Sequence, residues 1–539
     1  MKINILKGLC ISLLLCGLTT SCSSDYLDTK PTSEISGDDI ATSIEKIRSV
    51  LEGVHGMMYQ YEWYSSDPLF GSGQASMQMH LDFLGDDMIN TKAGFHISQH
   101  RYQDTNTPYT TFNFEVWDFY YTLIQHLNAV INDAEALNDP DNSDVASVLG
   151  EAYSLRAFCY HNLVQCFGKR YVKGGDNSSL GVPLRLKQDY EVVPRSTVEK
   201  CYEQINSDIT KGIDNLTKAP DLGRKNAVSL ATAYGLAARI ALTQQDYPKA
   251  EEYAKDAIEK AKEDGIHLAT GDFSTGGDLL DGFNTINNSE WMWGYTQASD
   301  QNLFYADFNS CFAYNTSGYN YGFRFAVRRD LYDAMGPKDI RRRWWVCGDL
   351  MVDQSPLAVD VPADADFSYF ASDWEKTGQC IKFASNGNST TMGDHCVMRL
   401  DEMYYIEAEA QARQSNKQAD AERTLNTIMQ TRDPEYVYSA KKGTLIDEIM
   451  RNKRIDMWGE GARFFDMKRL GIIPVRKDAK NLEIIRQYWP EEYNAAALRF
   501  AEANEVDMPK SVDDVNWQFI IPYDEIKAGQ GMIEQNPLR

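Results

Sequence analysis

Two stretches of this sequence combine aromatic rings with hydrogen-bonding side chains in the mixture that sugar binding requires. The first runs from Tyr102 to Tyr109, and the second runs from Tyr305 to Phe325. A pyranose ring presents C–H groups on one face, which stack on Tyr or Trp, and hydroxyls around its rim, which bond to Asp, Asn, Lys or Arg. The candidate contact residues are Asp87, Tyr102, Asn106, Tyr109, Tyr314, Tyr319, Tyr321 and Arg324.

Each candidate tyrosine also has a structural interpretation, because an aromatic side chain in a long loop can pack that loop onto the body of the protein. For a single residue we favour packing slightly, whereas for the whole set we expect at least one or two to contact a ligand. Trp291 and Trp293 alternate around Met292 in a strand-like run, and this pattern predicts core positions for both rings.

Motifs that would indicate catalysis are absent from the sequence, which contains no HExxH, no GxxxxGK[ST] and no GxSxG. His96 and His100 are four residues apart without an obvious third ligand, so we interpret them as loop or surface histidines rather than a metal site. Asp86 and Asp87 are adjacent and point in different directions, which suits a hydroxyl ligand or a loop brace better than an acid–base pair. We therefore predict no catalytic residue, no metal and no cofactor. A glycosidase carboxylate pair formed by residues distant in sequence remains an alternative.

Apolar residues recur at helical spacing in blocks that could position these loops. The predicted helices cover 38–60, 114–137, 145–167, 196–216, 228–244, 248–263, 398–414, 418–432 and 444–458. Ser196 and Glu199 have the spacing of a capping box, and Pro248 has a first-turn position. The segments 61–113 and 265–395 are rich in Gly, Asn, Tyr and Trp, which is typical of functional loops or a second subdomain. A third, mixed excursion is expected over 473–520.

The helix pair at 228–263 carries a repeat signal. Ala250, Ala254 and Ala257 follow Tyr247 at the small-residue spacing of the second helix of a tetratricopeptide unit. Gly235 is one of several small residues on the preceding helix and allows a close approach. The pair at 398–432 repeats the pattern more loosely, so the two copies support stacked helix pairs as the scaffold.

Several charged residues stand beside apolar residues within predicted helices. They are Arg156, Arg399, Glu409, Arg463 and Asp466. A buried charge without a partner costs several kcal/mol, so charges in such positions are usually paired. We predict structural ion pairs for all five.

The N-terminus is typical of an exported lipoprotein. Residues 1–21 have a charged start and an apolar stretch from Gly8 to Leu18, which is too short to span a bilayer. The segment ends in small residues before Cys22, and a polar run follows at once, so we predict lipidation of Cys22 and a tether over 22–37. Ordinary signal cleavage with an incidental Cys22 is the alternative.

Composition narrows the class of protein further. The 539 residues are 43% hydrophobic and 24% charged, which is a globular composition, and the formal charge is −24. An acidic chain repels phosphate backbones, so nucleic acid is an unexpected partner. Cys159 and Cys166 are seven apart in a helical pattern and are expected in the core. Cys347 and Cys380 are the pair we considered for a disulfide.

Further short motifs occur in a fixed order along the chain. They are Tyr26-Leu27-Asp28, Gly150 to Gly168, Gly181-Val-Pro-Leu184, Arg195-Ser-Thr-Val198, Met398-Arg-Leu400 to Ala410, Gly459-Glu-Gly-Ala-Arg-Phe-Phe-Asp466, Ile520-Ile-Pro522 and Gln535-Asn-Pro537. With the lipoprotein start, they resemble the SusD/RagB family of nutrient-binding outer-membrane lipoproteins. The resemblance covers essentially the whole chain after the signal.

This resemblance implies a mainly α fold, in which tetratricopeptide-like helix pairs (a SusD-like α-α superhelix) carry a large irregular loop-rich ligand-binding region. It implies a single body over 38–539, anchored by lipid in the outer membrane and facing the cell surface. The implied role is to capture an oligosaccharide and deliver it to a TonB-dependent, SusC-like transporter, which the cluster from Tyr59 to Tyr64 could face. Two alternatives are a cryptic glycoside hydrolase and a tetratricopeptide-type protein-interaction scaffold.

Overall fold

The computed structural model describes residues 43–59, 71, 73–90, 94, 96–189, 191–272, 276–298, 308–315, 325–346, 378–387, 390–477, 479–488, 490–504 and 507–538. The signal, Cys22, the tether, Tyr319, Tyr321, Arg324 and Cys347 lie outside these ranges. The predictions made for those residues therefore stay predictions.

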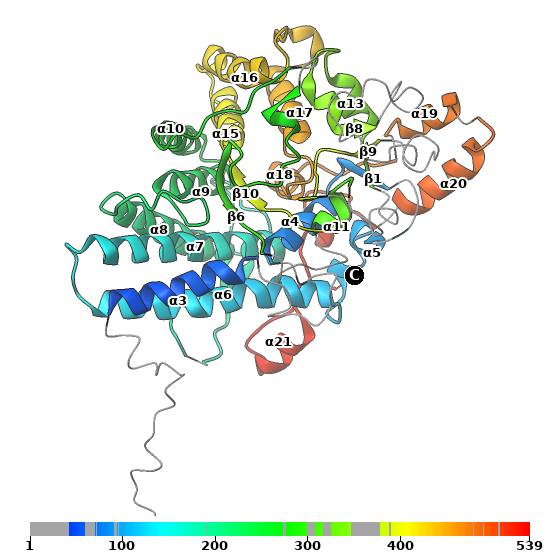
Figure 1. Ribbon diagram of the computed structural model, residues 1–539. Coiled ribbons are helices and arrows are strands. Elements are labelled where there is room, and N and C mark those ends of the chain that lie inside the picture. Colours follow the sequence, from blue (N-terminus) through cyan, green and yellow to red (C-terminus); the bar gives the residue numbers. More distant parts are fainter. Residues whose placement is uncertain are drawn as a thin grey trace, which may run out of the picture.

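Antiparallel helices stacked side by side form one side of the molecule (Figure 1). In chain order they are α3 (Ile44–Met57), α6 (Thr111–Ala136), α7 (Ser143–Phe167), α8 (Val198–Leu216), α9 (Leu230–Thr243) and α10 (Tyr247–Glu263). The stack continues through α15 (Leu400–Ala412), α16 (Gln418–Arg432), α17 (Leu445–Asp456) and α18 (Arg463–Leu470). Because α10 packs directly on α15, the helices of the two halves of the chain form one continuous scaffold. The predicted helix pairs are confirmed.

Side-chain caps explain where several of these helices begin. Asn142 accepts hydrogen bonds from the first backbone N–H groups of α7, and Ser229 accepts one from Thr232 in α9. The capping box predicted at Ser196 is wrong by one residue, because Thr197 accepts from the Lys200 N–H at 3.2 Å. Ser196 instead belongs to the short strand β3 (Arg195–Thr197), which pairs with β2 (Leu180–Pro183) and sets the direction of entry into α8.

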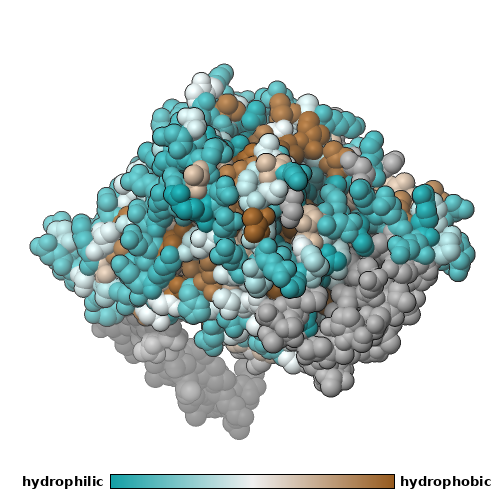
Figure 2. All heavy atoms as spheres, turned by 90° about the horizontal axis from the view of Figure 1, so that it is seen from above, coloured by the Kyte–Doolittle hydropathy of each residue, from teal (hydrophilic) through white to brown (hydrophobic). Residues whose placement is uncertain are grey.

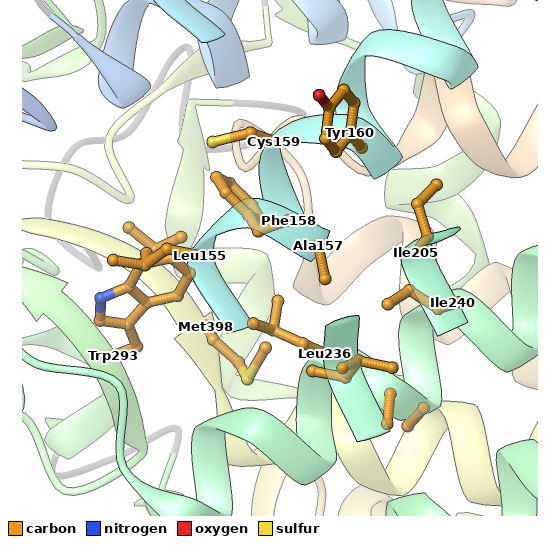
Figure 3. Close-up of a cluster of buried hydrophobic side chains, with 14 of the residues drawn as sticks. Leu155, Ala157, Phe158, Cys159, Tyr160, Ile205, Leu236, Ile240, Trp293 and Met398 are labelled. Atoms are coloured by element: carbon orange, nitrogen blue, oxygen red, sulfur yellow. The ribbon is translucent and has the colours of Figure 1, made fainter. Parts of the chain in front are cut away.

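The main core lies where α7, α8 and α9 meet the strands that carry Trp293 and Met398, on the loop-rich side of the molecule (Figure 3). Phe158 of α7 stands edge-on to Trp293, with ring centroids 5.2 Å apart, and Leu236 of α9 faces the same cluster. A Cβ at Gly235 would lie 2.5 Å from the sulfur of Met398, so glycine at this position admits the Met398 side chain rather than a residue of the paired helix α10.

Buried cysteines contribute to the core as free thiols. Cys159 and Cys166 are fully buried, as predicted. Burial raises the pKa of the Cys166 thiol to about 12, so it stays a neutral apolar group. Cys380 is also a buried free thiol. Cys347, the partner considered for a disulfide with it, lies outside the described residues.

Short strands and helices make up the loop-rich side. Strands β1 (Met88–Asn90), β7 (Phe325–Val327), β9 (Gln379–Cys380) and β8 (Trp345–Val346) form an antiparallel sheet in that order. A second pair joins β6 (Trp291–Tyr295) to β10 (His395–Arg399), and β4 (Gly271–Asp272) pairs with β5 (Gly276–Gly277). Trp291 and Trp293 are completely buried, which confirms the predicted core strand.

The remaining helices lie between and after these strands. They are α4 (Gln74–Phe83), α5 (Ile97–His100), α11 (Phe308–Phe312), α13 (Arg329–Ala334), α19 (Asn481–Tyr488), α20 (Tyr493–Asn504) and α21 (Tyr523–Ala528). Short 3₁₀ turns cover Asp104–Asn106, Asp278–Leu280, Ile340–Trp344, Ala440–Lys442 and Val515–Trp517. Helix α4 differs from the loop expected there. Its residues are buried on almost every side, so the sequence carries no amphipathic period that would indicate a helix.

Seen from above, the surface is largely hydrophilic, and hydrophobic side chains gather in its middle (Figure 2). In the part of the chain that the structure describes, no helix has both the length and the apolar character needed to cross a bilayer.

Candidate ligand-binding surface

The first aromatic loop divides into a buried start and an exposed end. Tyr102 is completely buried, with a left-handed backbone (φ 57°), and its hydroxyl donates to the carbonyl oxygen of Leu84. The guanidinium of Arg476 lies 5.8 Å from the centre of its ring. Tyr102 therefore packs the loop onto the body, and its ring offers no face to a ligand.

Tyr109 lies at the other end of the loop and is 74% exposed. Its ring centroid lies 5.1 Å from that of Tyr523, the first residue of α21, which is 45% exposed. The backbone fixes this pair, because the Tyr523 N–H donates to the Pro108 carbonyl at 2.9 Å and the Ile520 N–H donates to the Thr105 carbonyl at 2.9 Å. The two rings form an exposed aromatic pair on a fixed backbone.

Asn106 braces the same loop from inside. Its side-chain amide donates to the Tyr102 carbonyl oxygen, while the residue itself is half-buried. Its carbonyl oxygen remains available as an acceptor beside the exposed end of the loop.

Asp87 is not at the surface with the exposed pair. It is buried and accepts from Arg454, with Oδ1 2.7 Å from Nε and 2.5 Å from Nη2. Its neighbour Asp86 accepts from the Nε of Arg463 at 2.7 Å. Burial alone would raise the pKa of Asp86, but Arg463 and Arg454 hold this pKa well below its ordinary value. The predicted alternative of a loop brace therefore describes the Asp86–Asp87 pair, and the role of a sugar ligand does not.

The second aromatic loop is described only in part. Tyr314 is half-buried, and its backbone N–H donates to the Phe383 carbonyl at 3.1 Å. The Asn315 side chain bonds twice to the backbone of Ser385, accepting at 2.7 Å and donating at 3.0 Å. The described parts of the two loops are thus attached to different segments, the first to α21 and the second to 383–385.

The two histidines considered as metal ligands are interior groups. His100 bonds to the Phe83 carbonyl at 2.9 Å and to Asn504 Oδ1 at 3.0 Å. His96 is buried against Phe83, and burial lowers its pKa to about 4. Among the described residues, no group of three or more His, Cys, Asp or Glu side chains could hold a metal ion.

Sequence reasoning missed Tyr523. The only local signal is an aromatic residue directly after Ile520-Ile-Pro522, where proline ends an extended segment and a helix begins. Its partnership with Tyr109 joins positions more than four hundred residues apart, which no local pattern indicates.

Stacked helix pairs that carry long loops place the protein among helical-repeat scaffolds of the tetratricopeptide-like type. Two family models match the sequence: one described as "Starch-binding associating with outer membrane" over residues 25–242, and one described as "SusD family" over residues 371–538. The chain belongs to the SusD/RagB family, which confirms the resemblance read from its motifs.

Relatives and solved structures agree with this assignment. A SusD-like protein, P2, from Formosa agariphila is 25% identical over 382 residues, covering 66% of this chain and 71% of that relative. A SusD superfamily protein from Bacteroides vulgatus superposes with a TM-score of 0.69 at 20% identity, covering 92% of this chain and 99% of the other. Surface glycan-binding protein A from Bacteroides thetaiotaomicron, solved with laminarihexaose, superposes with a TM-score of 0.64 at 18% identity, covering 91% and 99% of the two chains.

Proposed function

We propose that this protein is a cell-surface lipoprotein that binds an oligosaccharide and passes it to a TonB-dependent, SusC-like transporter in the outer membrane. The observation that carries the proposal is family membership, together with a relative of the same fold that was solved with a bound glucan hexasaccharide. The family description supports the outer membrane as the location.

The exposed Tyr109–Tyr523 pair supports this function at the level of side chains. Two rings held 5.1 Å apart by backbone hydrogen bonds offer a stacking surface that needs little ordering when a ligand arrives. Asn106 lies at the base of the same loop and can accept from a sugar hydroxyl. Tyr314 is half-buried and stays a candidate, as do Tyr319, Tyr321 and Arg324 outside the described residues.

Replacing Tyr109 by Ala should weaken binding of the cognate glycan about tenfold. An aromatic stack contributes about 1 kcal/mol beyond the area that it buries, and 1.4 kcal/mol corresponds to a factor of ten in Kd. A glycan array would identify the ligand for a chain starting at Ser23, and calorimetry would compare the variants. Tyr493→Ala is the matched control, because Tyr493 lies on α20 and stacks with Arg486 instead. Equal affinity for Tyr109→Ala, Tyr523→Ala and the unaltered chain would remove the pair from the site.

The two alternative functions predict different results. A glycoside hydrolase would release reducing ends from the glycans that it binds, whereas we expect intact glycan to be recovered after prolonged incubation. A protein-interaction scaffold would show no glycan affinity at all on the array. Either result would displace the proposed function.

A further inference from the structure

A groove with a volume of about 400 Å³ lies between α6, α21 and the loop that joins β2 to β3. Helix α6 contributes Trp117, Asp118 and Tyr121, the loop contributes Arg185, and α21 contributes Glu525. Pockets of roughly 300–1,000 Å³ are the usual size for small-molecule ligands. The groove is separate from the predicted aromatic loops, since none of its lining residues lies within 102–109 or 305–325.

The walls of the groove are fixed by hydrogen bonds. The Tyr121 hydroxyl donates to the Pro183 carbonyl at 2.8 Å, and the Asn128 amide donates to the Arg185 carbonyl at 3.0 Å. The Trp117 ring packs against the Tyr121 ring with centroids 4.8 Å apart. The loop is therefore held against α6, and the concave shape exists before any ligand binds.

Two of the three carboxyl groups that line this space, those of Asp118 and Glu525, are half-buried. Burial raises the pKa of Asp118 to about 6, and the charge of Glu525 adds to the effect. Burial also raises the pKa of Glu525, although a hydrogen bond from Trp117 and the charge of Arg185 oppose this shift. Among the described residues, Asp118 has no hydrogen-bond or ion-pair partner. A partly desolvated acceptor without a donor is costly, so a ligand that brings hydroxyl donors would be stabilised there.

The balance of charges around the groove indicates whether its ligand is anionic, cationic or neutral. Asp118, Asp189 and Glu525 oppose Arg185 and Lys187, so neither sign dominates. A polyanion would meet three carboxyl groups, and a cation would meet an arginine and a lysine. A neutral, hydroxyl-rich ligand meets acceptors, donors and an aromatic wall without an unbalanced charge.

We propose that this groove is a second binding site for a neutral oligosaccharide, separate from the Tyr109–Tyr523 pair. The inference rests on the proposed function in one respect, that the protein binds glycans. Both sites border α21, since Tyr523 begins that helix and Glu525 and Ala528 follow within it. Helix α6 begins at Thr111, directly after the loop that ends at Tyr109. Asp118 lies seven residues further along this helix, a rise of about 10 Å. One side of the molecule thus carries both sites.

Hydrogen–deuterium exchange of the unaltered chain from Ser23, with and without laminarihexaose or maltohexaose, tests the groove directly. We expect one of these neutral hexasaccharides to protect peptides covering 183–193 and 525–533. This protection should persist in Tyr109→Ala, because the groove does not include that residue. Exchange that is unchanged in both regions, with binding detected by calorimetry, would overturn the groove and leave the proposed function standing.

Two variants with matched controls give the second test. In Asp118→Ala, about ten times more glycan should be needed to protect the groove peptides to the same level. Asp133→Ala, on the same helix but outside the groove, should need no more glycan than the unaltered chain. Ala528→Trp should fill the groove and remove the protection, whereas Lys527→Trp, also exposed on α21, should not. Unfolding midpoints should match the unaltered chain. Equal protection in all four variants would also overturn the inference, and no binding of either hexasaccharide or of any array glycan by the unaltered chain would overturn both proposals.

Discussion

Buried arginines join segments that are far apart in the sequence. Arg399 lies completely buried among three carboxylates, 2.8 Å from Glu290, 2.9 Å from Asp401 and 2.9 Å from Glu460. Arg476 donates to the backbone carbonyls of Phe83, Gly85 and His100. Breaking such a buried pair from one side typically costs about 3–5 kcal/mol, because the other charge is left alone. These residues hold the loop-rich side in register with the helices.

Asp82 of α4 is an exception, because it is buried and makes no ion pair with any of the described residues. Burial chiefly raises its pKa to about 8, and a hydrogen bond from the Gly461 backbone opposes the shift only in part. The folded pKa lies above the unfolded value of about 3.9, so the native state binds the proton more tightly. Its contribution to stability is therefore complete below about pH 4 and is lost as the pH rises through 8.

Asp82→Asn should consequently gain stability relative to the unaltered protein as the pH rises from 6 to 9. Between pH 6 and 9 only about two of the four pKa units contribute, which corresponds to about 2.7 kcal/mol at most, and we expect roughly 2 kcal/mol after local relaxation. Urea unfolding at both pH values measures the difference, in which all other titrating groups cancel. Asp133→Asn, on a partly exposed site of α6, is the control. Parallel pH profiles for the unaltered chain and Asp82→Asn would contradict the prediction.

The sequence predicts ion pairs of charged residues in helices better than it predicts which loop residues are exposed. Arg156 pairs with Asp208 at 2.7 Å, Arg463 with Asp86 and Asp466 with Lys453, so the ion pairs expected from helical context are confirmed. All five predicted charges have such partners, including Glu409 with Arg469 and Arg399 with its three carboxylates. By contrast, Tyr102 and Asp87 are interior although their loops have the composition of a binding surface. Burial of a loop residue depends on contacts with distant segments, which residue type does not encode.

At the scale of elements, small residues decide how closely the helices pack. Helix α8 meets α7 at Gly212, where an added Cβ would lie 2.3 Å from the Ser154 hydroxyl and 3.2 Å from the Gly150 carbonyl. Gly150 makes a similar approach from the other helix, toward Leu216. The crossing of these two helices therefore has no room for even one methyl group.

Gly212→Ala should destabilise the protein by about 1–3 kcal/mol, because the helices must move apart to admit the methyl group. Gly53→Ala provides the opposite comparison. Gly53 lies inside α3 and has nothing within 4 Å of an added Cβ, so alanine should stabilise that helix by up to about 1 kcal/mol. Thermal and urea unfolding of both variants checks the signs. Destabilisation by both substitutions, or by neither, would show that the helix crossing is not the cause.

Helices and strands could be predicted where their signal lies within a short stretch of sequence. The helices from α6 to α10 and from α15 to α17 begin and end within a few residues of their predicted ranges, because amphipathic periods and caps are local signals. Helix α4 lacks that period because it is buried all round. The sheet was not predictable, since Met88 pairs with Val327 and Ala326 pairs with Gln379. Pairings across such distances depend on the scaffold that brings the segments together.

At the scale of the whole molecule, the helical scaffold begins close to the proposed anchor. Helix α3 starts at Ile44, 22 residues after Cys22. A fully extended chain of that length reaches at most about 70–80 Å. The proposed lipid on Cys22 would therefore keep the start of α3 within that distance of the membrane.

Replacing Cys22 by Ala should release the protein from the membrane fraction. The reason is that a lipid on Cys22 is the proposed anchor, and no described helix can cross a bilayer. Fractionation of cells followed by immunoblotting measures the distribution, and Cys201→Ala, which changes a buried thiol, is the control for cysteine loss in general. A Cys22→Ala protein that is processed normally yet stays in the membrane fraction would argue against the lipid anchor.

Under the proposed function, a captured glycan is useful to the cell only if it crosses the outer membrane, and a lipoprotein anchored on one face would not carry it across. We therefore expect a stable complex with a TonB-dependent barrel. Mild detergent extraction followed by pull-down on a C-terminal tag should recover such a barrel, identified by mass spectrometry, together with the lipoprotein. An abundant unrelated outer-membrane barrel should be absent from the eluate. Tyr109→Ala should recover the partner as well as the unaltered chain does, because we propose that this exposed residue contacts the ligand rather than the transporter. Recovery of the lipoprotein alone, under conditions that preserve other membrane complexes, would remove the transporter from the proposed function while leaving glycan binding intact.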